Sequence, residues 1–171
     1  RGLALENTTL TLDGTGIPRF DRTTLQCGSS SIFIAGDANN DVPVLHEASH
    51  EGWIAGENAA RFPGVQAGLR RAPLNIVFTD PQISLAGSTF ASIRGTPHLV
   101  GEVSFENQGR ARVMLRNKGL LHVYAETGTG RFLGAEMIGP DAEHIAHLLA
   151  WARQMNLTIR QMLEMPFYHP V

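Results

Sequence analysis

Residues 31–52 read SIFIAGDANNDVPVLHEASHEG and join a predicted strand to a predicted helix. The run 31–35 is β-branched and aromatic and is bounded by serines and Gly36, which predicts a buried strand. A helical pattern extends from about Pro43 to Ala60, and a proline suits the first turn of a helix. The apolar face of this helix is expected to contain Val44, Leu45, Ala48, Ile54 and Ala55. The order strand, Gly-Asp turn and helix is therefore expected here.

Asp37, at the end of the predicted strand, is the first candidate for binding a ligand. An aspartate at the carboxyl end of a strand lies where ligands bind in open α/β sheets, and its carboxylate can accept a hydrogen bond from a sugar-like hydroxyl. The helix start that follows offers backbone N–H groups and the positive end of the helix dipole. Because Gly-Asp is also an ordinary turn dipeptide, the pattern alone leaves both interpretations open.

The second half of the chain shows a different pattern, in which predicted strands come first and helices follow. The predicted strands cover residues 74–78, 99–105, 110–116, 120–126 and 131–138. Helical patterns follow at 141–155 and, with Thr158 as the cap, up to about Met165. Strands grouped together and followed by helices predict an α+β fold with helices on one face of an antiparallel sheet. The stretch 61–71 is interpreted as a linker, so the expected domains are 1–69 and 70–171.

Composition limits the classes of function. Of the 171 residues, 43% are hydrophobic and 18% are charged, which is enough for a buried core. The formal net charge of −2 gives no electrostatic reason to expect nucleic acid or a membrane as partner, and no apolar run approaches the length of a membrane-spanning helix. The single cysteine, Cys27, cannot form an internal disulfide, so a reducing, cytoplasmic location is expected. Because the chain does not begin with Met, we expect it to be part of a larger protein.

The segment His46-Glu47-Ala48-Ser49-His50 matches the His-Glu-x-x-His pattern of zinc metalloproteases and lies on the predicted helix. Two imidazoles at i and i+4 can bind one zinc ion, with Glu47 as general base. A catalytic zinc needs a third protein ligand, and Gly56 stands where the extended pattern places its last histidine. The helix-surface interpretation is therefore favoured, no residue is assigned as a metal ligand, and a zinc hydrolase is kept only as an alternative.

Several segments of the chain resemble one known family. The run 31–52, with IFIAGDANND, PVLHEA and Glu51-Gly52, resembles the second FAD-binding signature of the pyridine nucleotide-disulfide oxidoreductases. PLNIVFTDPQIS resembles the entry into their interface domain, and GRFLGAEMIGPDAEHI and MPFYHPV resemble that domain's last strand, its long helix and the segment with the active-site histidine. The resemblance covers essentially the whole chain. It implies a returning segment of a FAD-binding α/β domain at 1–69 and a dimerisation domain at 70–171.

The resemblance implies a cofactor-binding role for Gly36, Asp37, Val44, Leu45 and His46. Asp37 would accept a hydrogen bond from the ribityl chain of the flavin. The backbone amides of about Val44 to His46 would face the flavin C2 carbonyl and stabilise negative charge on the reduced ring. His169 would be the acid–base partner of the dithiol, delivered across a homodimer to the other subunit, with a cis bond to Pro170.

The resemblance also implies an activity. The family's first FAD glycine motif, its redox-active cysteine pair and its nicotinamide-binding domain have no match in these 171 residues, so the chain alone is expected to be inactive. The His169-Pro170 pair favours disulfide reduction, and the parent is expected to be a dihydrolipoamide dehydrogenase that couples dithiol oxidation through FAD to NAD reduction. Its expected partners are a second copy, through 70–171, and a lipoyl-bearing multienzyme complex. A non-catalytic dimerisation module of a glutathione-reductase-like enzyme is the alternative.

Overall fold

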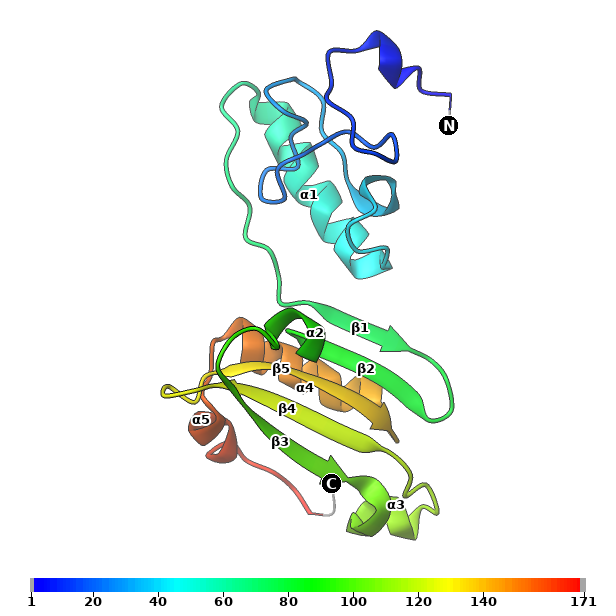
Figure 1. Ribbon diagram of the computed structural model, residues 1–171, viewed down its shortest axis with the longest axis vertical. Helices are drawn as coiled ribbons and strands as arrows, with labels where there is room; N and C mark the ends of the chain where they lie inside the picture. The colour runs from blue at the N-terminus through cyan, green and yellow to red at the C-terminus, as the bar shows by residue number, and fades with distance from the viewer. Residues whose placement is uncertain (1, 170–171) are drawn as a thin grey trace. The chain divides into compact units, whose positions relative to one another are not determined.

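The computed structural model describes residues 2–169, and the chain divides into two compact units (Figure 1). The first unit comprises Arg1–Arg70 and the second comprises Arg71–Val171. Each unit has hydrophobic clusters of its own. Among residues 2–169, no helix combines the length and the apolar character that crossing a membrane would require.

The first unit is built around one long helix, α1, which covers Leu45–Arg61. Loops surround this helix, together with two 3-10 turns, η1 (Leu5–Asn7) and η2 (Gly36–Asn39), and isolated β-bridges. The buried core of the unit consists of Leu25, Ile54 and Ala55, with Phe20, Phe33 and Ala35 packed against them. The apolar side of α1 thereby holds the surrounding loops.

The predicted buried strand at 31–35 is wrong. This run forms one isolated bridge, between Phe33 and Gln26, and Ile32 is 41% exposed. A strand needs a regular neighbouring strand whose backbone N–H and C=O groups pair with its own. Residues 2–70 contain no regular strand that could serve as such a neighbour, and the run therefore does not become part of a sheet.

Helix α1 forms close to its predicted position, but its buried face differs from the prediction. Leu45, expected on the apolar face, is 87% exposed, whereas Ile54 and Ala55 are buried as expected. Three polar residues share the buried face, namely Glu47, Glu51 and Asn58. Polar side chains are buried in a protein when they have hydrogen-bond or ionic partners. Those partners lie elsewhere in the chain, so the helical pattern does not reveal them.

The second unit is a five-stranded antiparallel sheet with the strand order β1-β2-β5-β4-β3. The strands are β1 (Leu74–Val77), β2 (Gln82–Gly87), β3 (His98–Ser104), β4 (Leu120–Glu126) and β5 (Phe132–Gly139). The long helix α4, Ala142–Gln154, packs on one face of the sheet against β1, β2 and β5 (Figure 1). The predicted α+β architecture, an antiparallel sheet with helices on one face, is confirmed.

Small side chains allow α4 to lie close to the sheet. Ala146 and Ala150 of the helix pack with Ala86 of β2 in one buried cluster. Two further clusters continue this core: Phe105, Ala111, Met137 and Ala142 form one, and Phe132, Ala135 and Ala152 form the other. Because alanines of the helix meet an alanine of β2, the helix and the sheet can approach closely at this cluster, while Phe105, Met137 and Phe132 fill the neighbouring clusters.

The predicted strand at 110–116 is wrong, because this segment contains a short helix. Helix α3 covers Gly109–Val113, and the Gln108 side chain caps it by accepting a hydrogen bond from the Ala111 N–H at 2.6 Å. Ala111 is 2% exposed and packs with Phe105. Arginines alternating with apolar residues fit a strand as well as a helix with one buried position. The cap and the single buried alanine favour the helix.

Strand β2 and helix α2 (Phe90–Ile93) have no counterpart in the prediction, and one predicted cap is confirmed. Strand β2 reads QISLAG, and its small and polar residues weaken the strand signal. Helix α2 is a single turn capped by Thr89. The short helix α5, Ile159–Leu163, begins at the predicted cap Thr158, which forms a reciprocal capping box with Gln161.

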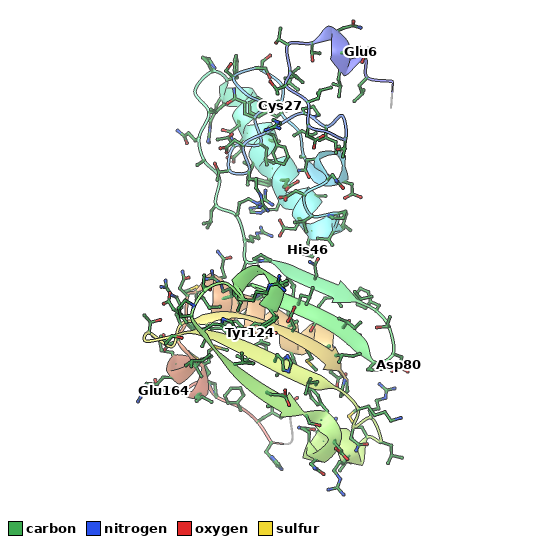
Figure 2. All side chains as sticks on the ribbon, in the orientation of Figure 1. Glu6, Cys27, His46, Asp80, Tyr124 and Glu164 are labelled. Atoms are coloured by element: carbon green, nitrogen blue, oxygen red, sulfur yellow. The ribbon has the colours of Figure 1, made fainter. Side chains whose placement is uncertain are left out.

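The sheet face opposite α4 carries polar side chains on three neighbouring strands. Glu102 of β3 and Glu136 of β5 are the direct ladder partners of His122 on β4. His122 Nε2 lies 2.9 Å from Glu102 Oε2, and the hydroxyl of Tyr124, which is labelled in Figure 2, donates a hydrogen bond to Glu136 Oε2. Tyr124 is only 1% exposed. Its burial, followed by the hydrogen bond to Glu136 and the charge of that carboxylate, raises the pKa of the Tyr124 phenol well above its usual value.

We expect Tyr124 to stay protonated at about pH 11 while the chain is folded, although an unperturbed phenol ionises near pH 10. Because its pKa is raised by folding, Tyr124 contributes stability that is fully present below the unfolded pKa and is lost as the pH rises through the folded pKa. At this pH the phenolate absorbance of the unsubstituted protein and of Tyr124→Phe should therefore agree in buffer. In denaturant the two should differ by the absorbance of one tyrosinate. A difference between the two folded proteins would contradict the prediction.

Candidate functional site

The Gly-Asp turn predicted to bind a ligand packs on the first turns of α1. Gly36 has a φ of +68°, a conformation that favours glycine, and a Cβ added there would lie 3.0 Å from the Cβ of Ala48. A side chain at Gly36 would therefore be strained by this φ and crowded against Ala48. The Asp37 side chain next to it is exposed, and within residues 2–169 its carboxylate forms no hydrogen bond or ion pair. Asp37 is thus accessible to a ligand.

The start of α1 has no side-chain cap. Val44, the N-cap residue, is extended with φ −132° and ψ 143°, and its side chain forms no capping hydrogen bond. The Ala48 N–H donates to the Val44 carbonyl at 3.0 Å. Leu45 and His46 lie in the first turn with exposed side chains, and His46 is labelled in Figure 2. The first turn of a helix has backbone N–H groups without intrahelical acceptors, so this end favours an electron-rich group.

The predicted residues of the first unit therefore belong to one region. The contact of Gly36 with Ala48 joins the turn that carries Asp37 to the helix that begins at Leu45. An exposed carboxylate accepts hydrogen bonds from hydroxyls, and the start of a helix donates them to electron-rich oxygens. The region can thus bind a ligand that presents both kinds of group.

Glu51 also belongs to this region, although the sequence pattern assigns it no role. It is 1% exposed, and its Oε2 accepts hydrogen bonds from the Gly36 N–H and from the Asn39 side-chain amide, both at 2.7 Å. Asn39 Oδ1 in turn accepts a hydrogen bond from the Asp41 N–H at 2.9 Å. One signal could have found it: Glu47 and Glu51 are spaced i, i+4 on the helix, so two like charges share one face.

Arg70 balances the negative charge of Glu51. Its Nη2 lies 2.9 Å from Glu51 Oε1 and 3.0 Å from Glu47 Oε2. Its Nη1 donates to the Arg22 carbonyl at 3.1 Å, and the Arg22 guanidinium pairs with Asp41 at 2.7 Å. Because Arg70 Nη2 is also 4.0 Å from Asp41, the carboxylates and guanidinium groups of these five residues form one network. Glu51 is its most buried member.

The zinc pattern of α1 is arranged differently from a metal site. Glu47, the expected general base of a zinc hydrolase, is 5% exposed and pairs with Arg70. His46 is exposed and His50 is half-buried. Over the described range 2–169, no group of three or more histidines, cysteines and acidic residues is placed to hold a metal ion. The zinc-hydrolase alternative therefore finds no third ligand in this range.

The remaining candidates lie elsewhere in the chain. Cys27 is 1% exposed, and burial raises the pKa of its thiol, which disfavours the reactive thiolate. His169 is exposed and belongs to the second unit, in the segment that follows α5. Pro170 lies outside the described residues, so the predicted cis bond between His169 and Pro170 stays a prediction.

Comparisons with known proteins identify the second unit. Residues 74–171 match the family model for the pyridine nucleotide-disulphide oxidoreductase dimerisation domain. Among curated relatives, the dihydrolipoyl dehydrogenase of Haloferax volcanii is 35% identical over 142 residues, which cover 81% of this chain and 30% of the relative. The dihydrolipoyl dehydrogenase of Halobacterium salinarum is 31% identical over 170 residues, which cover 95% of this chain and 35% of the relative. The chain thus spans about a third of the length of these relatives.

Solved structures share the fold across both units. LpdA from Mycobacterium tuberculosis matches with a TM-score of 0.83 at 23% identity, over 99% of this chain and 37% of that one. The HOCl-induced flavoprotein disulfide reductase RclA from Escherichia coli matches with a TM-score of 0.81 at 22% identity, over 99% of this chain and 39% of that one. At these identities the likeness shows the fold alone. Because the dimerisation-domain model covers more than half of the chain, the chain belongs to the pyridine nucleotide-disulphide oxidoreductase family.

Proposed function

We propose that this chain is part of a flavin-dependent disulfide oxidoreductase of the dihydrolipoamide dehydrogenase type, which oxidises a dithiol and passes the electrons through FAD to NAD. The observation that carries the proposal is the exposed Asp37 on a turn packed against the uncapped start of α1. Residues 1–69 would be the returning segment of the FAD-binding domain, and 70–171 the dimerisation domain.

The residues of the first unit fit the ribityl chain and the ring edge of a flavin. The Asp37 carboxylate is exposed and would accept a hydrogen bond from a ribityl hydroxyl. The uncapped helix start at Val44 would direct the amides of Leu45 and His46 to the electron-rich C2 carbonyl. Gly36 lets the turn lie close to the helix, because a Cβ there would be crowded at 3.0 Å from the Ala48 Cβ. FAD supplies the electron-accepting group between the dithiol and the nicotinamide.

His169 is proposed as the acid–base residue for the dithiol. A neutral imidazole can accept the proton of a thiol, which leaves the more reactive thiolate, and can later return the proton. The side chain is exposed in the segment that follows α5, where it is accessible to a group on a second subunit. Its delivery across a homodimer is part of the proposal.

The identity of the dithiol is supported by the names of the curated relatives, which are dihydrolipoyl dehydrogenases. A dihydrolipoyl group as substrate and a lipoyl-bearing multienzyme complex as partner are proposed on that basis. RclA, described as a flavoprotein disulfide reductase, shares the fold at 22% identity. A disulfide reductase with another substrate, glutathione included, is therefore the second candidate, and turnover with dihydrolipoamide compared with glutathione separates the two.

The proposed homodimer is supported by the outward side of α4. Leu148, Trp151 and the C-cap residue Met155 are 65%, 64% and 71% exposed, and their spacing aligns them along one side of the helix. A row of large exposed apolar side chains is typical of an interaction surface. Because this stripe lies in the match to a dimerisation domain, a second copy of the chain is its expected partner.

We expect the double substitution Leu148→Arg and Trp151→Arg to convert a dimer to a monomer, because two charges would be buried in the proposed interface. Light scattering of the full-length protein measures the mass directly. Leu115→Arg is the matched control, since Leu115 is 89% exposed and lies outside the stripe. A double variant that remains a dimer would show that α4 does not form the interface.

We expect Asp37→Ala to weaken FAD binding about tenfold, which is the size of one lost charge-assisted hydrogen bond. The measurement is titration of the flavin-depleted full-length protein with FAD, followed by visible absorption. Glu57→Ala is the control, because Glu57 is an exposed carboxylate in helix α1 of the same unit. Unchanged FAD affinity in Asp37→Ala would contradict the assignment of the flavin site.

We expect His169→Ala to slow dithiol-dependent NAD reduction by about 10²–10⁴-fold, the usual contribution of a general acid–base group. The bound FAD per subunit should stay the same, because no flavin contact is assigned to His169. Tyr168→Phe serves as the control at the neighbouring exposed position. Full activity of His169→Ala in the flavin-loaded protein would rule out this role.

A further inference from the structure

We propose that Glu51 is a positioning residue for the flavin site, and that its buried carboxylate holds the turn which presents Asp37. This inference rests on the proposed function, because it assigns a purpose to the turn. Glu51 itself is 1% exposed, and it would act on the ligand only through the backbone of the turn. The clamp is defined here as the Glu51 carboxylate with its two donors, Gly36 N–H and the Asn39 side-chain amide.

The clamp grips the turn on both sides of Asp37. Gly36 precedes Asp37 in η2, and Asn39 is the last residue of η2. Both donate to the same oxygen, Glu51 Oε2, at 2.7 Å, and Asn39 is itself 5% exposed. Two short bonds to one ionised oxygen are stronger than bonds between neutral groups. The backbone on either side of Asp37 is therefore fixed relative to α1.

Asp37 depends on this clamp because it has no side-chain support of its own. Within residues 2–169 its carboxylate forms no hydrogen bond or ion pair, so its position follows from the backbone of η2. The contacts with α1 that position this backbone include the packing of Gly36 on Ala48 and the clamp from Glu51. The packing contact sets the distance between turn and helix, and the clamp sets the orientation of the turn.

The buried Glu51 carboxylate has a cation on one side and hydrogen-bond donors on the other. Arg70 Nη2 lies 2.9 Å from Oε1, on the side of the carboxylate that does not hold the turn. A buried carboxylate is costly without a cation and hydrogen-bond donors, and here Arg70 supplies the cation while the turn supplies the donors. Oε1 thus faces the ion pair and Oε2 faces the turn, so one side chain connects Arg70 to the backbone next to Asp37.

A control residue exists on the same helix. Asn58 is 2% exposed on the buried face of α1 and binds the carbonyls of Thr24 and Gln66 and the Gln66 N–H at 2.8–3.0 Å. Its loss would destabilise the same unit, but Asn58 has no bond to η2. Comparing Glu51 with Asn58 therefore separates positioning of the turn from general stability.

The experiment uses the full-length protein, depleted of flavin and titrated with FAD, with visible circular dichroism of the bound flavin and thermal unfolding as parallel readouts. Glu51→Ala is expected to weaken FAD binding about tenfold or more and to change the flavin dichroism, because two charge-assisted bonds to the turn are lost. Glu51→Gln, whose amide oxygen can still accept from the turn, is expected to fall between the parent and Glu51→Ala. Asn58→Ala is expected to lower the unfolding midpoint while changing FAD affinity by less than about twofold and leaving the dichroism as it was.

Asn39→Ala keeps the test decisive if Glu51→Ala does not fold, since it removes one clamp bond and leaves the ion pair intact. It is expected to weaken FAD binding by a smaller factor and to change the dichroism in the same direction. The inference is overturned if Glu51→Gln and Asn39→Ala bind FAD like the parent, or if each variant loses affinity only in proportion to its loss of stability, as Asn58→Ala does. If Asp37→Ala also leaves FAD affinity unchanged, the proposed function fails as well; if only Asp37→Ala weakens it, the positioning role alone fails.

Discussion

The guanidinium of Arg70 lies between Glu47 and Glu51, and the first unit depends on that ion pair. Glu51 is 1% exposed, and removing one partner of a buried ion pair typically costs about 3–5 kcal/mol. The apolar core around Leu25 is small, so polar contacts contribute much of what fixes the conformation of the loops. The Glu51 carboxylate consequently binds both the turn with Asp37 and Arg70, the last residue of the first unit.

The second unit is held together mainly by close apolar packing between α4 and the sheet. Its helix α4 meets the sheet through alanines, and a clash-free close approach leaves little freedom in the position of the helix. The opposite face is polar along the line of Glu102, His122 and Glu136, where side chains from three strands interact across the ladder. The sheet face that packs against α4 therefore fixes the position of the helix. The exposed stripe on the other side of α4 is left free of contacts within the core that residues 71–169 of the second unit form.

Patterns in the sequence predicted the elements whose partners are close along the chain. The sheet strands β4 and β5, helix α4 and the cap at Thr158 follow from periodicity and local capping. The strand predicted at 31–35 does not form because residues 2–70 contain no regular strand to pair with it. The strand predicted at 110–116 is helix α3 instead, in which a single alanine, Ala111, is buried. The turn with Asp37 and the start of α1 were predictable as local motifs. For Glu51 the sequence offers only its i, i+4 spacing from Glu47, because the donors and the cation that bind its carboxylate meet it only in three dimensions.

The position of Arg70 at the last residue of the first unit has a practical consequence for anyone who divides this chain. A piece ending at the boundary suggested by the sequence, residue 69, retains α1, η2 and both buried carboxylates but lacks their common cation. Two like charges would then face each other in a poorly hydrated interior. A piece only one residue longer carries the counter-ion with it. The end of an expressed segment should therefore be chosen so that each buried carboxylate keeps its counter-ion. Here the single residue Arg70 decides whether it does.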